Sequence, residues 1–259
     1  MTGLQFAPPA PGSWRAFLDR HAVAVFTTIT VVVTVAILLA PLPTIAGPAL
    51  VVFIPALVAA LLLRLTGGSI RNQLFSKHVW RISAKWAAIS LGAALALRLA
   101  ASVLGLFAGR PFTPGPFIPF LLAGFLFAAG EEIGWRGFAL PRLLASGRSP
   151  LIAALMLGVP WALLHLPLVL PGKLSAGTPM AAQFLVMVAL SVLTSWAYLA
   201  SGRSLTAAAL LHGGQNLFAF LNDGLGPVAS GWLMAIAYGG AALLIAVLTK
   251  GRLGWRDGG

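Results

Sequence analysis

Cysteine is absent from this 259-residue sequence, and acidic residues are scarce. Without cysteine, the protein can form no disulfide bond and cannot use a thiolate as a nucleophile. Charged residues make up only 8% of the chain, whereas hydrophobic residues make up 59%. A water-soluble surface requires far more charge than this. The composition therefore indicates a protein that lies mostly within a lipid bilayer.

Long apolar stretches separated by short loops run through the whole sequence. A membrane-spanning helix needs about 20 apolar residues. We therefore expect an all-α, polytopic membrane helix bundle of about eight transmembrane helices, near 22–40, 45–63, 86–108, 117–140, 151–170, 180–201, 204–222 and 228–249. The predicted organisation is an N-terminal tail (1–21), a membrane domain (22–249, with its motif core at 117–222) and a basic tail (250–259).

The net charge of +12 is distributed unevenly over the predicted loops. If both termini are cytoplasmic, the opposite side carries only Arg110 and Lys173, and the cytoplasmic side carries Arg15, Arg20, Arg64, Arg71, Lys77, Arg81, Lys85, Arg142, Arg148, Arg203, Lys250, Arg252 and Arg256. This asymmetry follows the positive-inside rule. We therefore predict both termini in the cytoplasm, a multi-pass protein of the plasma membrane, and anionic lipid rather than nucleic acid as the partner of the basic residues.

The two glutamates of the chain, Glu131 and Glu132, are adjacent and lie inside an apolar stretch. A carboxylate in hydrocarbon costs at least about 2.5 kcal/mol, so such residues usually line a cavity or a pathway. Glu132 precedes Arg136 by four residues, which is the favoured spacing for an ion pair on one helix face. Glu131 lies about 100° around the helix and has no such partner. We expect a supporting role for Glu132 and Arg136 and a functional role for Glu131.

Three further polar side chains are predicted within spans. His165 follows Trp161 by one helical turn, and His212 and Asn216 are four residues apart on one helix face. Counted along the helices, Glu131, His212, Asn216 and His165 lie roughly 9 to 21 Å from the cytoplasmic face. Helices tilt, and helix ends are imprecise when they are read from a sequence. The four side chains can therefore lie at the same depth in the membrane, although the sequence does not require it.

These residue types suffice for peptide-bond hydrolysis. Glu131, helped by His165, would take a proton from water, and His212 and Asn216 would donate hydrogen bonds to the oxyanion. Alternatively, Glu131, His165 and His212 form a zinc ligand set with one position left for water. We favour the scheme without a cofactor, because a carboxamide is a poor zinc ligand and Asn216 would then have no role.

Other membrane-protease mechanisms lack their residues. The sequence contains neither His-Glu-x-x-His nor Gly-x-Ser-x-Gly. A pair of intramembrane aspartates is also excluded, because Asp19, Asp223 and Asp257 all lie outside the predicted spans.

The ordered set Glu131-Glu132-x-x-x-Arg136, Trp161-x-x-x-His165 and His212-x-x-x-Asn216 resembles the signature of the CPBP family. This family comprises type II CAAX prenyl endopeptidases and their bacterial relatives, also called the Abi family. The resemblance covers about 90 residues. Trp161 departs from the phenylalanine that is frequent at its position in the family.

The resemblance implies a bundle of eight helices with a cavity that opens to the cytoplasm and the membrane. It also implies that Glu131 and His165 activate water and that His212 and Asn216 hold the oxyanion. Members have been named metalloproteases, although the structural view of the family favours a metal-free mechanism. The expected substrate is a peptide or a membrane protein.

Two other interpretations stay open. In a proton- or cation-coupled transporter, the same polar residues would bind the ion. Such a protein would be expected to contain inverted repeats and broken helices, and the sequence offers only Pro160 and Pro167 around His165. The third interpretation is a non-catalytic membrane partner that retains the motif. The role of Arg98, which lies in the third predicted span, is also left open.

Overall fold

The computed structural model describes residues 14–43 and 46–255, and all regular structure in these residues is helical. The α-helices are α1 (Trp14–Arg20), α2 (Ala22–Leu39), α3 (Ala46–Val51), α4 (Ile54–Thr66), α5 (Ile70–Leu74), α6 (Lys77–Trp80), α7 (Ala84–Phe107), α8 (Pro119–Glu132), α9 (Leu140–Ala145), α10 (Pro150–His165), α11 (Met180–Ala200), α12 (Leu205–Leu217) and α13 (Gly226–Leu248). A π-helix, η1 (Ile133–Ala139), and two 3₁₀-helices, η2 (Leu166–Val169) and η3 (Ala219–Leu225), connect some of them. The predicted all-α architecture is confirmed. Parts of both predicted tails, 1–13 and 256–259, lie outside the described residues.

Several predicted spans agree closely with observed helices. Within the described part of the chain, six stretches are long and apolar enough to cross a membrane. One of them, Leu205–Leu248, combines α12 and α13, and the segment formed by α8, η1 and α9 is not among the six. The chain is therefore a multi-pass membrane protein. The number of eight spans and the cytoplasmic position of the termini stay predictions.

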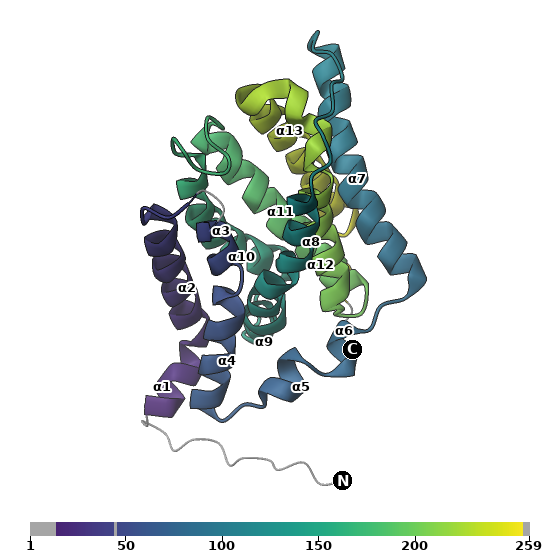
Figure 1. The fold of residues 1–259 in the computed structure, drawn as a ribbon. Helices are drawn as coiled ribbons and strands as arrows, with labels where there is room; N and C mark the ends of the chain where they lie inside the picture. The colour runs from purple at the N-terminus through teal and green to yellow at the C-terminus, as the bar shows by residue number, and fades with distance from the viewer. Residues whose placement is uncertain (1–13, 44–45, 256–259) are drawn as a thin grey trace.

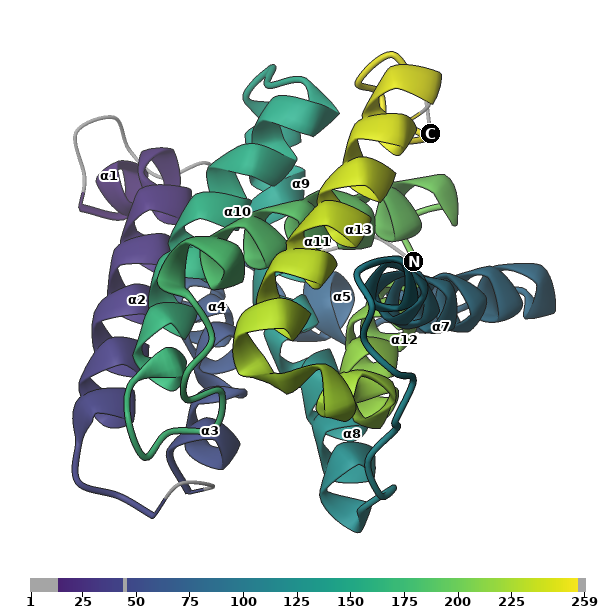
Figure 2. The same ribbon diagram turned by 90° about the horizontal axis from the view of Figure 1, so that it is seen from above.

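Helix α12 occupies a central position in the bundle (Figures 1 and 2). It packs against α7, α8 and α11, while α10 packs against α2 and α11, and α13 packs against α7 and α11. Helices α2 and α7 lie at opposite edges of the bundle in both views. The helices that carry the predicted site residues, α8, α10 and α12, are therefore inner helices.

Serine side chains fix where two of these inner helices begin. The Ser149 hydroxyl accepts a hydrogen bond from the backbone N–H of Ile152 at the start of α10, and Ser204 does the same for Ala207 at the start of α12. Such N-caps satisfy backbone donors that the first helical turn leaves free. Because the starts of α10 and α12 are fixed, the heights of His165 and His212 in the bundle are fixed as well.

The loops that contain most of the basic residues meet at one end of the bundle. There, the backbone N–H of Leu151, at the start of α10, donates to the carbonyl of Gly251, which follows α13. The Thr206 hydroxyl, at the start of α12, donates to the Trp80 carbonyl at the end of α6. Segments distant in the sequence are thus joined on the side that we predict to face the cytoplasm.

Arg110 and Lys173 lie elsewhere, next to the far ends of other helices. Lys173 donates to the carbonyl of Ala40, which follows α2, and Arg110 donates to the carbonyl of Leu225 before α13. The described loops therefore reproduce the charge asymmetry of the sequence between the two ends of the bundle.

Helices α8, η1 and α9 form one continuous helical segment. Its middle part, η1, is a π-helix of seven residues. A π-helix is rare and frequently occurs near functional sites. The segment packs very closely against α4, since a Cβ atom built on Gly134 would lie 2.5 Å from Cβ of Pro55. The π-helix begins immediately after Glu131 and Glu132, so it sets the direction in which Arg136 projects relative to both carboxylates.

Candidate active site

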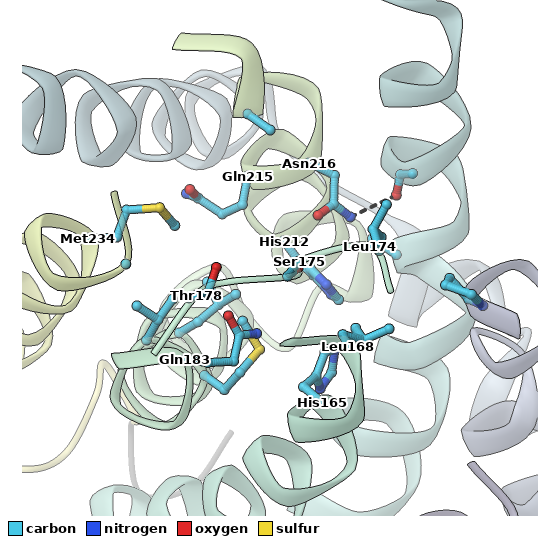
Figure 3. A pocket seen from close by; sticks show the side chains of 18 of the residues that line it. His165, Leu168, Leu174, Ser175, Thr178, Gln183, His212, Gln215, Asn216 and Met234 are labelled. Atoms are coloured by element: carbon cyan, nitrogen blue, oxygen red, sulfur yellow. Dashed lines mark hydrogen bonds between the residues drawn. The ribbon is translucent and has the colours of Figure 1, made fainter. Parts of the chain in front are cut away.

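A cavity of about 610 Å³ lies within the bundle, and all four residues predicted to be catalytic line it: Glu131, His165, His212 and Asn216. They come from three different helices, α8, α10 and α12. Figure 3 shows the rings of His165 and His212 on the same side of this pocket, with Asn216 one turn along α12. The separate sequence motifs thus converge on one cavity.

Glu132 does not line this cavity and is fully buried behind it. One of its oxygens, Oε1, accepts hydrogen bonds from Nη1 of Arg136 at 3.0 Å and from Nδ1 of His212 at 2.9 Å. The ion pair predicted from the four-residue spacing is therefore present. Because a carboxylate only accepts, Nδ1 of His212 carries a hydrogen, and Nε2 is the ring nitrogen left for other contacts.

Arg136 is itself held by a further helix. Its Nη2 donates to the carbonyl of Ser191 at 3.2 Å and to the Ser191 hydroxyl at 3.1 Å, on α11. Its guanidinium carbon lies 4.7 Å from the centre of the Trp161 ring. A buried charge is tolerated when it is paired and hydrogen-bonded. The buried Glu132, Arg136 and His212 thus form one polar network that joins α8, η1, α11 and α12.

Glu131 has a different environment from its neighbour. Its Oε2 accepts one hydrogen bond from the indole Nε1 of Trp161 at 2.7 Å, and no cation forms an ion pair with it among the described residues. Its other oxygen, Oε1, accepts no hydrogen bond from any residue that the structure describes. Glu131 therefore combines access to the cavity with an oxygen that is available to accept a proton.

The hydrogen bond of His165 determines which of its nitrogens carries the proton. Nδ1 lies 2.7 Å from the carbonyl oxygen of Trp161. A carbonyl only accepts, so Nδ1 is the protonated nitrogen in the neutral ring, and Nε2 presents a lone pair. Helix α10 ends at His165 and continues as the short 3₁₀-helix η2 that contains Pro167. His165 is therefore placed at a helix end, where it is half-buried and able to contact a water molecule.

Asn216 is half-buried and is held against α8. Its Nδ2 donates to the carbonyl of Gly124 at 3.0 Å, which leaves the second N–H of the amide group available. The close packing of α8 and α12 depends on Gly213, because a Cβ atom there would lie 2.5 Å from the carbonyl oxygen of Phe125. This approach brings Asn216 and Glu131 to the same cavity.

The alternative zinc site requires Glu131, His165 and His212 to lie around one metal ion. Among the described residues, no three His, Asp or Glu side chains are arranged to hold a metal ion. Nδ1 of both histidines is engaged, with Glu132 in one case and with the Trp161 carbonyl in the other, so Nε2 is the nitrogen that each ring could offer to a metal. The ligand set of Glu131, His165 and His212 stays an alternative prediction.

The extent of the cavity differs from what the family resemblance implies. Its lining includes residues 174–176 and Thr178, in the loop that follows Lys173, and contains none of the residues of the basic end. The cavity therefore extends towards the end of the bundle that is poor in basic residues. The resemblance implies an opening to the cytoplasm, which we predicted to lie at the basic end.

For two residues named from the sequence, Trp161 and Arg98, the contacts in the site were not predicted. Trp161 contacts Glu131 through its N–H, holds His165 through its carbonyl, and its ring lies edge-on to the His212 ring, with centroids 5.1 Å apart. The i to i+4 spacing to His165 was a signal for only one of these contacts. Arg98 lines the cavity and contacts neither glutamate, so its role could not be read from the sequence.

A family model described as type II CAAX prenyl endopeptidase Rce1-like matches residues 113–218. No curated protein matches the sequence. The matched segment runs from the approach to α8 to the residue after α12, and it contains every site residue predicted from the three motifs. The family assignment implies a membrane endopeptidase of the CAAX-protease-like type. Through this segment, the chain is similar to the type II CAAX prenyl endopeptidases, and this similarity supports the resemblance to the CPBP family that the three motifs carry.

Proposed function

We propose that this protein is an intramembrane endopeptidase that hydrolyses a peptide bond with water activated by Glu131 and His165. The single observation that supports this most strongly is the pair of contrasting carboxylates. Glu132 is paired with Arg136 and His212 through its Oε1, whereas Glu131 faces the cavity with one neutral donor. A general base needs an oxygen within hydrogen-bond reach of the water that it deprotonates.

In the first step, Glu131 takes a proton from a water molecule in the cavity, and the resulting hydroxide attacks the carbonyl carbon of the scissile bond. His165 orients that water, because its Nε2 lone pair can accept the second hydrogen of the water. The reaction then reaches a tetrahedral intermediate whose oxygen carries the negative charge. As the C–N bond breaks, the protonated Glu131 gives its proton to the leaving nitrogen, so the products are a carboxylic acid, which then ionises, and an amine.

The oxyanion would be stabilised by donors from α12. When His212 is protonated, Nδ1–H donates to Glu132 and Nε2–H points to the other side of the ring. Asn216 contributes the N–H that Gly124 does not use. A preorganised donor of this kind contributes about 3 kcal/mol in other hydrolases. The supporting role of Glu132 is to keep the His212 ring in its orientation, and Arg136 holds Glu132 in place.

The substrate class that we propose is a peptide or a membrane protein whose cleavage site reaches the cavity. Most of the cavity wall outside the polar cluster is apolar, with Leu38, Val52, Phe127 and Leu168 among its residues. Such a surface suits a hydrophobic segment. We propose the plasma membrane as the location, in keeping with the charge asymmetry between the two ends of the bundle.

The test is cleavage of a peptide library by protein purified in detergent, with wild type, Glu131→Gln, His212→Gln and a control. Both site variants are expected to lose at least about a hundredfold in rate while the protein stays folded. Ser175→Ala is the control, because Ser175 lines the cavity without belonging to the proposed machinery. Undiminished cleavage by Glu131→Gln would remove this residue from its role. Proton-coupled uptake by proteoliposomes, with no cleavage, would instead favour the transporter.

A further inference from the structure

Arg98 is a buried cation in the middle of α7, and no carboxylate within residues 14–43 or 46–255 forms an ion pair with it. It is 9% exposed, and it lines the cavity. The two ion pairs formed by described residues both involve Glu132, and neither involves Arg98. A charged residue within a membrane span is costly, and it usually pairs with another group or contacts a ligand. Arg136, the other arginine inside the bundle, has its carboxylate, whereas Arg98 has none.

The protein contacts of Arg98 are to neutral acceptors. Its Nε and Nη2 both donate to the carbonyl oxygen of Gln215, at 3.0 and 2.6 Å, and its Nη1 donates to Oδ1 of Asn222 at 3.2 Å. A second contact of Nη1 is to the sulfur of Met234 at 3.1 Å. These contacts hold α7 against α12, η3 and α13, and they account for a structural contribution of the side chain.

They do not use the full capacity of the guanidinium group. A guanidinium carries five N–H donors in a planar fork. One hydrogen of Nη2 has no bond to the protein, and one hydrogen of Nη1 is directed to a thioether, which is a weak acceptor. A carboxylate can replace such contacts with two parallel, charge-assisted hydrogen bonds. The Arg98 side chain thus has both the N–H donors and the positive charge that are needed to bind an anion.

The position of Arg98 relates this capacity to the proposed hydrolysis. The carbonyl that Arg98 holds belongs to Gln215, which lies between His212 and Asn216 on α12. The rise from His212 to Gln215 is about 4.5 Å, and an extended peptide advances about 3.3 Å per residue. A substrate whose scissile carbonyl contacts His212 and Asn216 would therefore bring a group only a few residues away to Arg98.

We propose that Arg98 is the centre of an anion subsite that binds a carboxylate of the peptide substrate, a few residues from the cleaved bond. This inference rests on the proposed function and adds a selectivity to it. The carboxylate is either the C-terminal one or that of an aspartate or glutamate side chain. In both cases its chemistry is the same, and matched peptides separate the two sources.

The experiment measures peptide binding, so it does not depend on turnover. Fluorescent peptides are titrated onto the full chain carrying Glu131→Gln in detergent, as two matched pairs. One pair ends in a free acid or an amide, and the other contains an internal Asp or Asn. We expect the charged member of one pair to bind at least about tenfold more tightly, as charge-assisted hydrogen bonds allow. Preference within the first pair identifies the C-terminal carboxylate, and preference within the second identifies the side chain.

Arg98→Gln, made in the same Glu131→Gln chain, is expected to reduce that preference to within about twofold while binding of the neutral peptide is retained. Arg110→Gln is the matched control, because Arg110 is an exposed arginine that donates to a carbonyl near η3 and does not line the cavity. It should leave the preference unchanged. If Arg98→Gln does not fold, Arg98→Lys retains the charge without the planar fork, and the preference should fall several-fold.

Equal binding of both members of both pairs by the Glu131→Gln chain overturns the proposal, as does an equal loss of affinity for charged and neutral peptides in Arg98→Gln. An Arg98-dependent response to phosphatidylglycerol vesicles, without any peptide preference, also overturns it and assigns the subsite to lipid. If the preference is present but wild type cleaves no peptide, the proposed hydrolysis fails while the anion subsite stands.

Discussion

Trp161 is the residue whose substitution tests the arrangement of the site most directly. Its indole N–H donates to Glu131 at 2.7 Å, and its side chain is completely buried. Trp161→Phe retains an aromatic ring next to Arg136 and His212 and removes this donor. A hydrogen bond to a charged group is worth about 1.5 to 3 kcal/mol. If that bond holds Glu131 in the orientation that deprotonates water, the loss corresponds to about a 10- to 100-fold decrease in kcat.

The chain offers a matched control for this substitution. Trp135 is also completely buried, but its indole N–H has no hydrogen-bond partner. Trp135→Phe therefore removes the same atoms from a packed interior without removing a hydrogen bond to a carboxylate. We expect it to retain kcat within about threefold, because none of the proposed donors or acceptors changes.

The assay compares kcat and KM of both variants on one cleaved peptide, together with thermal unfolding in detergent. The decrease in Trp161→Phe should be in kcat, with KM nearly unchanged, since the lost contact is to the proposed base and not to the substrate. Replacement of Trp161 by benzothienylalanine, in which sulfur stands in place of the N–H, should reproduce the loss at nearly constant shape. Full activity in that variant, or equal losses in Trp161→Phe and Trp135→Phe, would refute the reasoning.

Three further expectations concern charge, packing and metal. Glu132→Gln removes the counter-ion of a buried arginine, so the free energy of unfolding should decrease by about 3 to 5 kcal/mol, as measured by chemical denaturation in detergent; an unchanged value would contradict the role of this pair. Gly134→Ala should lower the unfolding temperature by several degrees, because its Cβ would overlap Pro55, whereas Gly92→Ala, in open space on α7, should leave that temperature unchanged or raise it. Cleavage should continue after dialysis against EDTA and should not follow zinc content; activity that is lost with zinc and restored by it would favour the alternative ligand set of Glu131 and the two histidines.

The position of the helices was largely predictable because the spans are long apolar runs that end at polar or helix-breaking residues. Helix α2 (Ala22–Leu39) and helix α11 (Met180–Ala200) end within a residue of the predicted bounds. The end of α12 was less predictable. It stops at Leu217, and the chain continues as a 3₁₀-helix to Leu225, because Asn222 is held by contacts to Arg98 and Ser102 on α7. Such an end is set by tertiary contacts and not by local sequence.

The same distinction applies to the site. The Glu132–Arg136 pair follows from a four-residue spacing, which is local information. The bond between Glu132 and His212 joins residues 80 apart, so no periodicity in the sequence could indicate it. The π-helix after Glu132 was also not predicted. Its sequence is compatible with an ordinary α-helix, and its packing against α4 at Gly134 is a property of the folded chain.

The two adjacent glutamates show how one local sequence produces opposite electrostatic environments. Glu132 and Arg136 are buried behind the cavity wall, and Glu132 holds His212, which lines the cavity, through Nδ1 of its ring. Coulomb attraction in a membrane interior decays slowly because the effective dielectric is low. The Arg136 charge therefore stabilises the negative charge that develops on the oxyanion during the proposed reaction. Neutralisation of Arg136 would therefore slow the proposed hydrolysis, even where the geometry of Glu131 is preserved. This electrostatic effect gives a physical reason for the position of the Glu132–Arg136 pair, which is buried away from the cavity, next to Glu131, which lines it.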